Sequence, residues 1–227
     1  LLAEAALPAP AIKTFDVQSE GLCLIVGHSD VALSAAEQLS EVIDVTVMLT
    51  DAPEIVPAKL DLLSGKIRNA SGSLGRFSIT VDTLRTLEPS GRGARKFSAP
   101  RDGGKSECDV ILDLTGNTPL FPANEKRDGY LRADPKDPLS VNRAVFEAAQ
   151  MEGTFEKPFY VGFEEHLCAH SRASQSGCNR CLNVCPTGAI TSKGDTVSID
   201  PNICAGCGEC AAVCPSGAVS YDAPPVS

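Results

Sequence analysis

The sequence has no tryptophan, and it has only two methionines and three histidines in 227 residues. Basic side chains are also scarce, with 20 Lys and Arg against 29 Asp and Glu, and the isoelectric point is near 4.8. This acidic balance argues against nucleic-acid binding by the whole surface. No run approaches the roughly 18 consecutive apolar residues of a transmembrane helix, so we expect no membrane span in these residues.

The composition is that of a soluble globular protein. Hydrophobic residues make up 43% and charged residues 22% of the chain, which excludes disordered, collagen-like and coiled-coil classes. At roughly 150 residues per domain, the length predicts one large domain or one ordinary and one small domain. Because the first residue is Leu1 rather than Met, we expect the sequence to begin inside a longer gene product or after a removed segment.

A strand–helix–strand pattern follows a short N-terminal arm. Residues 1–20 are rich in Ala and Pro and show no sustained periodicity, so they are interpreted as a leader or arm. Residues 21–27 and 44–50 are buried-strand runs, and residues 29–42 between them show helical spacing of apolar residues behind a Ser29/Asp30 cap. Parallel strands joined by a helix predict a sheet covered on both faces, which is the start of a doubly wound α/β domain.

The rest of the first part of the chain extends this prediction. Residues 66–81 alternate as antiparallel strands do, and residues 108–116 form another buried strand. A helix is expected from Ser140, with Val141, Val145, Phe146 and Ala149 on its apolar face, and residues 155–163 form a last strand-like run. We therefore predict a Rossmann-like α/β domain over residues 21–163.

The first strand–helix turn is a poor nucleotide site. Gly27 is followed by His28, Ser29 and Asp30, whereas dinucleotide-binding domains carry Gly-x-Gly-x-x-Gly for close approach to the pyrophosphate. An aspartate at the helix start also repels phosphate. A structural α/β domain is favoured, and flavin or NAD(P) binding is kept as the alternative.

Ten cysteines decide the chemistry of the second part. Cys23 and Cys108 stand apart and are interpreted as small buried hydrophobic residues, while eight others lie between positions 168 and 214. A disulfide scaffold spreads its cysteines through a chain without a core, whereas here an apolar domain precedes a cysteine-dense tail. Metal ligation is therefore favoured over disulfides.

The cysteine-dense tail contains an internal repeat. Residues 178–190 (CNRCLNVCPTGAI) align with residues 207–219 (CGECAAVCPSGAV) with seven identities in thirteen. Cys204 completes the run Cys204-x2-Cys207-x2-Cys210-x3-Cys214-Pro215. Bacterial-type ferredoxins carry this spacing, in which the fourth cysteine ligates the other cluster.

Residues 166–222 resemble the dicluster [4Fe–4S] ferredoxins. The resemblance implies a small α+β domain of two pseudo-symmetric halves, here residues 164–227, with residues 189–200 as the connecting hairpin and two [4Fe–4S] clusters as cofactors. It also implies that Pro186 and Pro215 shield the clusters. The implied ligands are, for cluster A, Cys168, Cys178, Cys181 and Cys214, and for cluster B, Cys204, Cys207, Cys210 and Cys185.

One ligand departs from the family pattern. The first cysteine of the first repeat is expected at position 175, where Gln175 stands instead, and Cys168 is the nearest thiol upstream. Lengthening the loop from two to nine residues costs on the order of 1–1.5 kcal/mol, which four thiolate–iron bonds can offset. We predict Cys168 as the ligand, and an incomplete or three-iron cluster A is the alternative.

Zinc and histidine ligation are both disfavoured. The contiguous Cys-x2-Cys-x2-Cys run crowds its thiolates, which suits a tetrahedral zinc ion poorly. His166 and His170 flank Cys168, but two-histidine ligation belongs to two-iron clusters. The two histidines are therefore interpreted as surface or loop residues, with hydrogen bonds to cluster sulfur as the alternative.

The whole chain is also similar to the N-terminal part of long bacterial iron–sulfur proteins encoded near formate dehydrogenases. The segments DVILDLTG, YLRADP and FEEHLCAHSR carry this resemblance. It implies redox protein partners, among them a formate dehydrogenase-type oxidoreductase, and a chain that is a fragment of a larger protein.

The predicted function is therefore single-electron transfer through two [4Fe–4S] clusters, by a carrier or an oxidoreductase subunit rather than a complete enzyme. The alternatives are a flavin- or NAD(P)-linked oxidoreductase subunit and a module in which the clusters sense oxygen or redox state. Cytoplasmic location is expected because reduced thiols belong there.

Overall fold

The structure is a computed structural model that describes residues 11–51, 60–87, 96–172 and 175–223, so the first ten residues of the predicted arm lie outside the described part. The chain forms two compact units. The first, here called the α/β unit, is Val17–Thr154, and the second, the cysteine unit, comprises Leu1–Asp16 and Phe155–Ser227. None of the helices in the described part of the chain is both long and apolar enough to cross a membrane.

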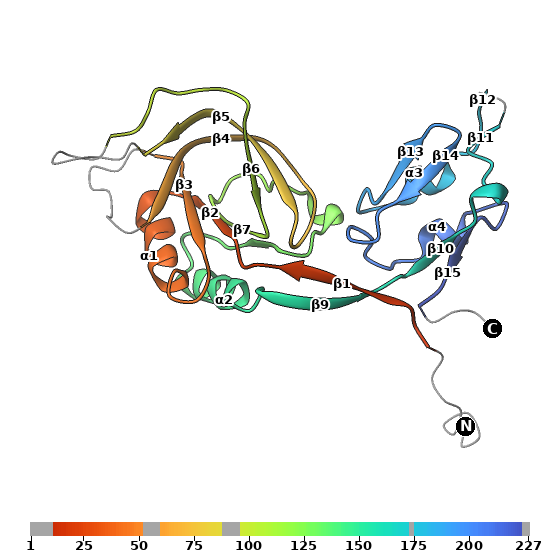
Figure 1. The fold of residues 1–227 in the computed structure, drawn as a ribbon, viewed down its shortest axis with the longest axis horizontal. Coiled ribbons are helices and arrows are strands. Elements are labelled where there is room, and N and C mark those ends of the chain that lie inside the picture. The colour runs from red at the N-terminus through yellow and green to blue at the C-terminus, as the bar shows by residue number, and fades with distance from the viewer. Residues whose placement is uncertain (1–10, 52–59, 88–95, 173–174, 224–227) are drawn as a thin grey trace, which may run out of the picture. The chain divides into compact units, whose positions relative to one another are not determined.

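A seven-stranded mixed sheet is the centre of the α/β unit, counted over the described residues, with the order β6-β5-β4-β3-β2-β7-β8 (Figure 1). Strands β2 (Cys23–Gly27), β3 (Val45–Leu49), β7 (Val110–Leu114) and β8 (Tyr130–Arg132) are parallel to one another and to the first residues of β4 (Asp61–Ser71). Strand β5 (Phe77–Thr86) is antiparallel to β4, and β6 (Gly104–Cys108) is antiparallel to β5.

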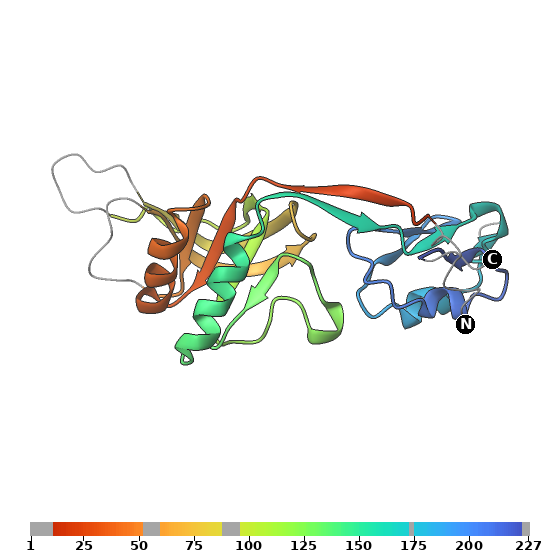
Figure 2. The same ribbon diagram turned by 90° about the horizontal axis from the view of Figure 1, so that it is seen from below.

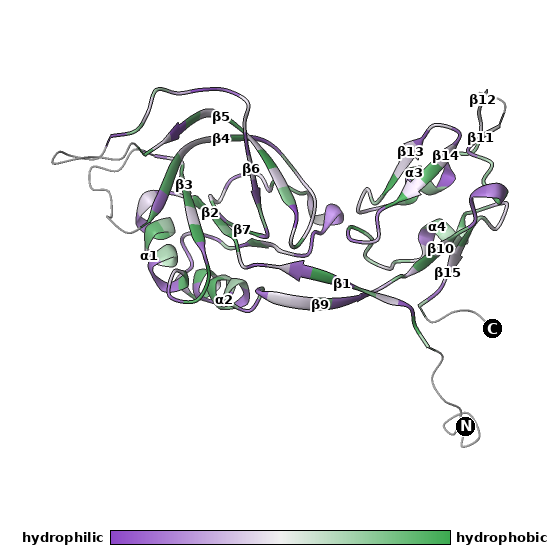
Figure 3. Cartoon of the chain, viewed as in Figure 1, coloured by the Kyte–Doolittle hydropathy of each residue, from purple (hydrophilic) through white to green (hydrophobic). Residues whose placement is uncertain are grey.

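Two helices cover one face of this sheet. Helix α1 (Ser29–Leu39) packs on β2 and β3, and α2 (Pro138–Ala149) packs on β7 and β8. The helices contact each other and lie side by side in both ribbon views (Figures 1 and 2). The hydrophobic colour gathers on these helices and the central strands (Figure 3), as expected where parallel strands are buried on both faces.

The other face of the central strands is covered by a later part of the same sheet. Leu24, Met48 and Ile111 pack there against Phe77 and Ile79 of β5. Register shifts at Ser64/Lys66 and Ile67/Asn69 bend the long strand β4, because a bulge increases local twist. Both faces of the sheet are therefore covered, as predicted, but the second cover is the antiparallel β4–β5–β6 extension and not, among the described residues, a layer of helices.

Helix α2 differs from its prediction in two details. It begins at Pro138, two residues earlier than expected. Asp137 caps it, because its side chain accepts a hydrogen bond from the Leu139 N–H. Its buried residues are Val141, Ala144, Val145 and Ala148, whereas Phe146 is 67% exposed, so the assignment of Phe146 to the apolar face is wrong. Buried small residues allow α1 and α2 to approach closely.

Short elements build the cysteine unit. Helices α3 (Arg180–Val184) and α4 (Glu209–Ala212) pack together, and the hairpin β13 (Ile190–Lys193)–β14 (Thr196–Ile199) confirms the predicted connecting hairpin. Strand β10 (Val161–Phe163) pairs with β15 (Val219–Tyr221), and β11 (Ser171–Arg172) pairs with β12 (Gln175–Ser176). A single 3-10 turn (Glu165–Leu167) leads into Cys168, and a similar turn (Ala123–Glu125) precedes β8 in the α/β unit.

A two-stranded ribbon joins segments far apart in sequence. Strand β1 (Thr14–Ser19), which falls inside the predicted N-terminal arm, pairs with β9 (Gly153–Pro158). The Thr14 hydroxyl donates to Glu156 Oε1 at 2.6 Å, and Phe15 packs against Phe159 with ring centroids 4.7 Å apart. The second half of the predicted arm is therefore a paired strand.

Candidate metal centre

Cysteine side chains form much of the interior of the cysteine unit. Cys181 on α3 and Cys210 on α4 are buried with Ile190, Val197 and Val219. Three further cysteines pack partly buried against this cluster, and they are Cys168, Cys185 and Cys214. A core this small and this rich in thiols is typical of a domain that is completed by metal binding.

Four thiols of the predicted cluster A surround one cavity. It is lined by Cys168, Cys178, Cys181 and Cys214, and also by His170, Arg180 and Pro215. The volume of this cavity is about 20 Å³. Among the described residues, no three His, Cys, Asp or Glu side chains converge on one point as ligands of a single ion do. The donor set fits a [4Fe–4S] cluster, which takes four thiolates.

A hairpin brings Cys168 to this cavity. The N–H of Gly177 donates to the His170 carbonyl at 2.6 Å, and the N–H of Cys178 donates to the Ala169 carbonyl at 2.9 Å. Beyond these bonds, β11 and β12 continue the pairing. The two ends of the segment inserted between Cys168 and Cys178 therefore pair with each other, which places Cys168 next to Cys178.

The two histidines beside Cys168 differ. His166 is exposed, and its Nδ1 lies 3.5 Å from Glu164 Oε2. His170 lies in a bend before β11, as its interpretation as a loop residue expects, but it is buried, so the interpretation as a surface residue is wrong. Its Nδ1 lies 2.8 Å from the Cys178 carbonyl oxygen and its Nε2 lies 2.8 Å from the Ser192 hydroxyl. Both bonds go to oxygen.

The thiols predicted for cluster B also lie together. Burial raises the pKa of Cys210 to about 11, and the neighbouring thiols of Cys204, Cys207 and Cys185 raise it further. Burial likewise raises the pKa of Cys204, and Cys185 and Cys207 add to this effect. Thiols influence one another in this way when they lie close together, so Cys204, Cys207, Cys210 and Cys185 form one group.

Two glycines shape the loop that carries Cys204 and Cys207. Gly206 has φ +73° and Gly208 has φ +75°, a conformation that favours glycine. A Cβ on Gly206 would lie 2.5 Å from the Tyr160 ring, and the Tyr221 hydroxyl donates to the Gly206 carbonyl at 3.2 Å. Tyr160 and Tyr221 therefore hold this loop closely.

The two prolines of the repeats occupy corresponding places. Pro186 is half-buried after Cys185, and Pro215 is exposed after Cys214 and lines the cavity of the first thiol group. At Cys214, burial acts to raise the pKa, but hydrogen bonds from the Val219 N–H and from Ser216 outweigh it and leave the pKa lowered. The thiolate of Cys214 is therefore stabilised by the backbone around it.

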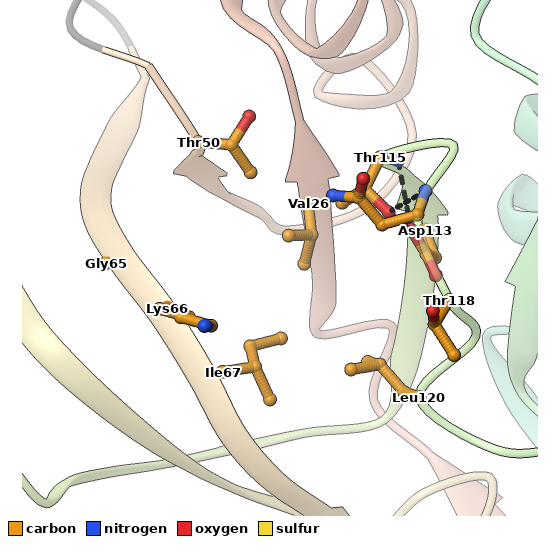
Figure 4. A pocket seen from close by; sticks show the side chains of 10 residues that line it. Val26, Thr50, Gly65, Lys66, Ile67, Asp113, Thr115, Thr118 and Leu120 are labelled. Atoms are coloured by element: carbon orange, nitrogen blue, oxygen red, sulfur yellow. Dashed lines mark hydrogen bonds between the residues drawn. The ribbon is translucent and has the colours of Figure 1, made fainter.

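The α/β unit has a crevice of its own (Figure 4). Its volume is about 380 Å³, and it lies where β4 bends away from the carboxyl ends of β2 and β7. Open parallel sheets bind ligands at such ends. The residues lining it are Val26, Thr50, Gly65, Lys66, Ile67, Asp113, Thr115, Asn117, Thr118 and Leu120.

Internal partners satisfy the buried carboxylate of this crevice. Asp113 Oδ1 accepts from the Thr115 hydroxyl at 2.6 Å, and its Oδ2 accepts from the Tyr130 hydroxyl at 2.6 Å and lies 3.7 Å from Arg132. Asp113 therefore holds β7, β8 and the following turn together.

Carboxylates occupy the amino end of α1. The Ser29 N–H and hydroxyl donate to Asp51 at 2.9 and 2.6 Å, and His28 bonds to Asp30 at 2.6 Å. The predicted Ser29/Asp30 cap is thus replaced by a cap from Asp51, after β3. A pyrophosphate in this position would meet two carboxylates, which supports the sequence-based argument against a dinucleotide.

Cys23 and Cys108 lie in the core of the α/β unit. They are 2% and 6% exposed, and burial raises the pKa of each to about 12. Their interpretation as small hydrophobic residues is confirmed.

Four parts of the site do not figure among the residues predicted from the sequence. They are the buried His170, Gly206, and the hydroxyls of Thr187 and Ser216, which lie 3.7 Å from Cys185 Sγ and Cys214 Sγ. Thr187 and Ser216 could have been found, because both repeats carry a hydroxyl two residues after the last cysteine. His170 gives no such signal, since its partners depend on the hairpin.

The family comparison agrees with this geometry. Residues 176–218 match the family model of the 4Fe-4S dicluster domain. The match begins after Cys168, so the position of that residue comes from the structure. A search of the curated proteins finds none that matches the chain. The chain is thus a mixed α/β protein with a large sheet and a C-terminal dicluster ferredoxin-like domain, which supports an iron–sulfur role in electron transfer.

Proposed function

We propose that this chain is an electron-transfer protein or oxidoreductase subunit that holds two [4Fe–4S] clusters. Cluster A is assigned to Cys168, Cys178, Cys181 and Cys214, and cluster B to Cys204, Cys207, Cys210 and Cys185. The observation that carries the proposal is the cavity lined by all four thiols of the first set, which come from both repeats and from beyond the family match.

A [4Fe–4S] cluster, when bound, takes up and releases one electron at a time. The residues of the chain hold the thiolates in place, exclude water and supply hydrogen bonds to sulfur. Burial of Cys181 and Cys210 keeps solvent from the inner side, and Pro186 and Pro215 are assigned to shielding. Because burial raises the pKa values of Cys181, Cys204 and Cys210, loading must displace protons from these thiols.

We assign the remaining parts of the chain as follows. The ferredoxin-like domain is residues 164–227, and the Rossmann-like domain of residues 21–163 docks it onto a partner. Redox proteins are the partners, with a formate dehydrogenase-type oxidoreductase as the specific candidate, and the location is the cytoplasm. The parallel strand order β4-β3-β2-β7-β8 supports the Rossmann-like assignment, since it corresponds to the order 3-2-1-4-5 of such sheets.

A flavin- or NAD(P)-linked subunit is the second candidate function. The crevice at the carboxyl ends of β2 and β7 favours it. The carboxylates of Asp30 and Asp51 at the start of α1 oppose it, because they occupy the usual place of the phosphates. Reduction of the clusters by NADH or NADPH, or a copurifying yellow chromophore, would select this candidate.

The test is iron and acid-labile sulfide analysis of anaerobically purified protein, with low-temperature EPR after dithionite reduction. We expect about eight irons per chain and two interacting cubane signals. About four irons per chain, or stoichiometric zinc, would overturn the two-cluster assignment. Cluster loss that abolishes partner binding without affecting electron flow would favour a sensing role.

A further inference from the structure

In each repeat, one hydroxyl lies beside the last cysteine, at the same position in the motif. Thr187 Oγ1 lies 3.7 Å from Cys185 Sγ, and Ser216 Oγ lies 3.7 Å from Cys214 Sγ. In each repeat a glycine with φ +66° follows the hydroxyl residue, so the backbone takes the same turn twice. The two contacts are therefore one motif repeated in the fold.

Cluster binding fixes the direction of these hydrogen bonds. A free thiol can donate to a hydroxyl or accept from it, but a thiolate bound to iron has no proton and can only accept. Each hydroxyl must then donate to sulfur. Such a bond favours the more negative reduced state of a cluster, and so raises its reduction potential.

The surroundings of the two contacts differ. Thr187 is 4% exposed, whereas Ser216 is exposed. Water competes for an exposed hydroxyl and screens its dipole, but a buried dipole acts in a low dielectric and has a larger effect.

We propose that the Thr187 hydroxyl tunes one cluster selectively: it raises the reduction potential of the cluster that Cys185 ligates, and Ser216 has a much smaller effect on the other. This inference rests on the two-cluster function proposed above. Because Cys185 lies in the first repeat but is assigned to cluster B, Thr187 acts on the cluster held mainly by the second repeat. The two clusters are thereby set at different potentials.

The experiment is an EPR-monitored redox titration of the full chain, purified without oxygen. Thr187→Val removes the hydroxyl at nearly constant volume, Thr187→Ser keeps it, and Ser216→Ala removes its counterpart. Thr191→Val, at an exposed position on β13, is the control for a surface Thr-to-Val change. We expect Thr187→Val to move one cluster to a more negative potential, Thr187→Ser and Thr191→Val to match the unmodified protein, and Ser216→Ala to give a clearly smaller shift of the other cluster.

Iron and sulfide content separates failure of this inference from failure of the proposed function. If the unmodified protein lacks two clusters, the function is wrong and the inference falls with it. If Thr187→Val retains both clusters and both potentials stay unchanged, the tuning role is wrong and the function stands. Equal shifts in Thr187→Val and Thr187→Ser would also overturn the role, since they would reflect packing. If the valine variant loses a cluster, Thr187→Ala gives the same readout without the added methyl group.

Discussion

The imidazole Nδ1 of His170 donates a hydrogen bond of 2.8 Å to the carbonyl oxygen of Cys178. Nδ1 must carry the hydrogen, because a carbonyl oxygen only accepts. On its other side, the ring contacts the Ser192 hydroxyl of β13 at 2.8 Å. His170 thus connects the inserted hairpin, the second thiol of cluster A and the neighbouring β-hairpin through one buried side chain.

Replacing His170 tests this connection. We expect His170→Ala to destabilise the cysteine unit by about 1–3 kcal/mol, because it leaves the Cys178 carbonyl and Ser192 without a buried partner. Iron should also leave cluster A faster in the presence of a chelator, as followed by the loss of visible absorbance. The His170→Asn variant retains an N–H donor near the position of Nδ1 and should be milder. Equal effects of the two variants would argue against the hydrogen bond.

Removing the thiol of Cys168 should affect one cluster only. In Cys168→Ala we expect iron content to fall from about eight to about seven or about four, with a three-iron signal or a single cubane signal by EPR. The matched control is Cys23→Ala, since Cys23 is buried in the α/β unit and is assigned no ligand role. Retention of two complete clusters in Cys168→Ala would show that another ligand takes this position.

The tight contact at Gly206 predicts a difference between two glycine substitutions. Gly206→Ala adds a methyl group 2.5 Å from the Tyr160 ring and strains a positive φ, so we expect loss of the cluster held by Cys204 and Cys207. Gly194 has φ +63° in the β13–β14 turn, where a methyl group would meet no neighbouring atom within 4 Å. Gly194→Ala should therefore cost only the backbone strain of about 1–2 kcal/mol and leave the iron content unchanged. Iron analysis and thermal unfolding of both variants check this.

Chelation of iron should separate the cysteines into two classes. The buried interior of the cysteine unit is small and consists largely of thiols, so bound iron is expected to supply most of its stability. We therefore expect iron removal to unfold the cysteine unit and to leave the sheet of the α/β unit folded. Iodoacetamide should then label the eight cysteines from 168 to 214 but leave Cys23 and Cys108 unlabelled until denaturant is added, as read by mass spectrometry. Labelling of Cys23 after chelation alone would contradict this.

His28 provides a pH-dependent contact. Its hydrogen bond with Asp30, and secondly the charge of Asp51, raise its pKa above 6.5. A raised pKa means that the contact stabilises the fold below about pH 6.5 and that this contribution is lost as the pH rises through the folded-state pKa. An NMR titration of the histidine rings should show this shift, and Asp30→Asn should reduce it. A His28 pKa at or below 6.5 in the unmodified protein would refute the contact.

Elements with strong periodicity are predictable from the sequence. Strands β2, β3 and β7 and helix α1 lie within a few residues of their predicted places, because buried runs and helical spacing are local signals. Strand β8 is not predictable in this way, since Tyr130–Arg132 is short and lies in a charged, Pro-rich stretch. The alternation of residues 66–81 predicts the antiparallel strands β4 and β5, but not that they cover the sheet, because the bend of β4 depends on bulges that leave no mark on its alternation.

The candidate site is predictable to the extent that ligand spacing is repeated. The three-cysteine run and its copy identify the candidate ligands without knowledge of the fold. The assignment of Cys168 requires an argument about the cost of a longer loop. The structure explains why this cost is small, because the two ends of the loop are hydrogen-bonded to each other. The buried His170 is not predictable, because burial of a residue in an insertion depends on the elements that surround it.

The cavity lined by both Cys168 and Cys214 also has a consequence for biosynthesis. Cys214 leaves the ribosome roughly fifty residues after Cys168, which at about 5–20 residues per second is a delay of roughly 2 to 10 seconds. From the synthesis of Cys181 onward, three thiols of the set are present without the fourth. The nascent chain therefore passes through a period in which its thiols are open to oxidation, and cluster delivery has to follow the synthesis of the second repeat.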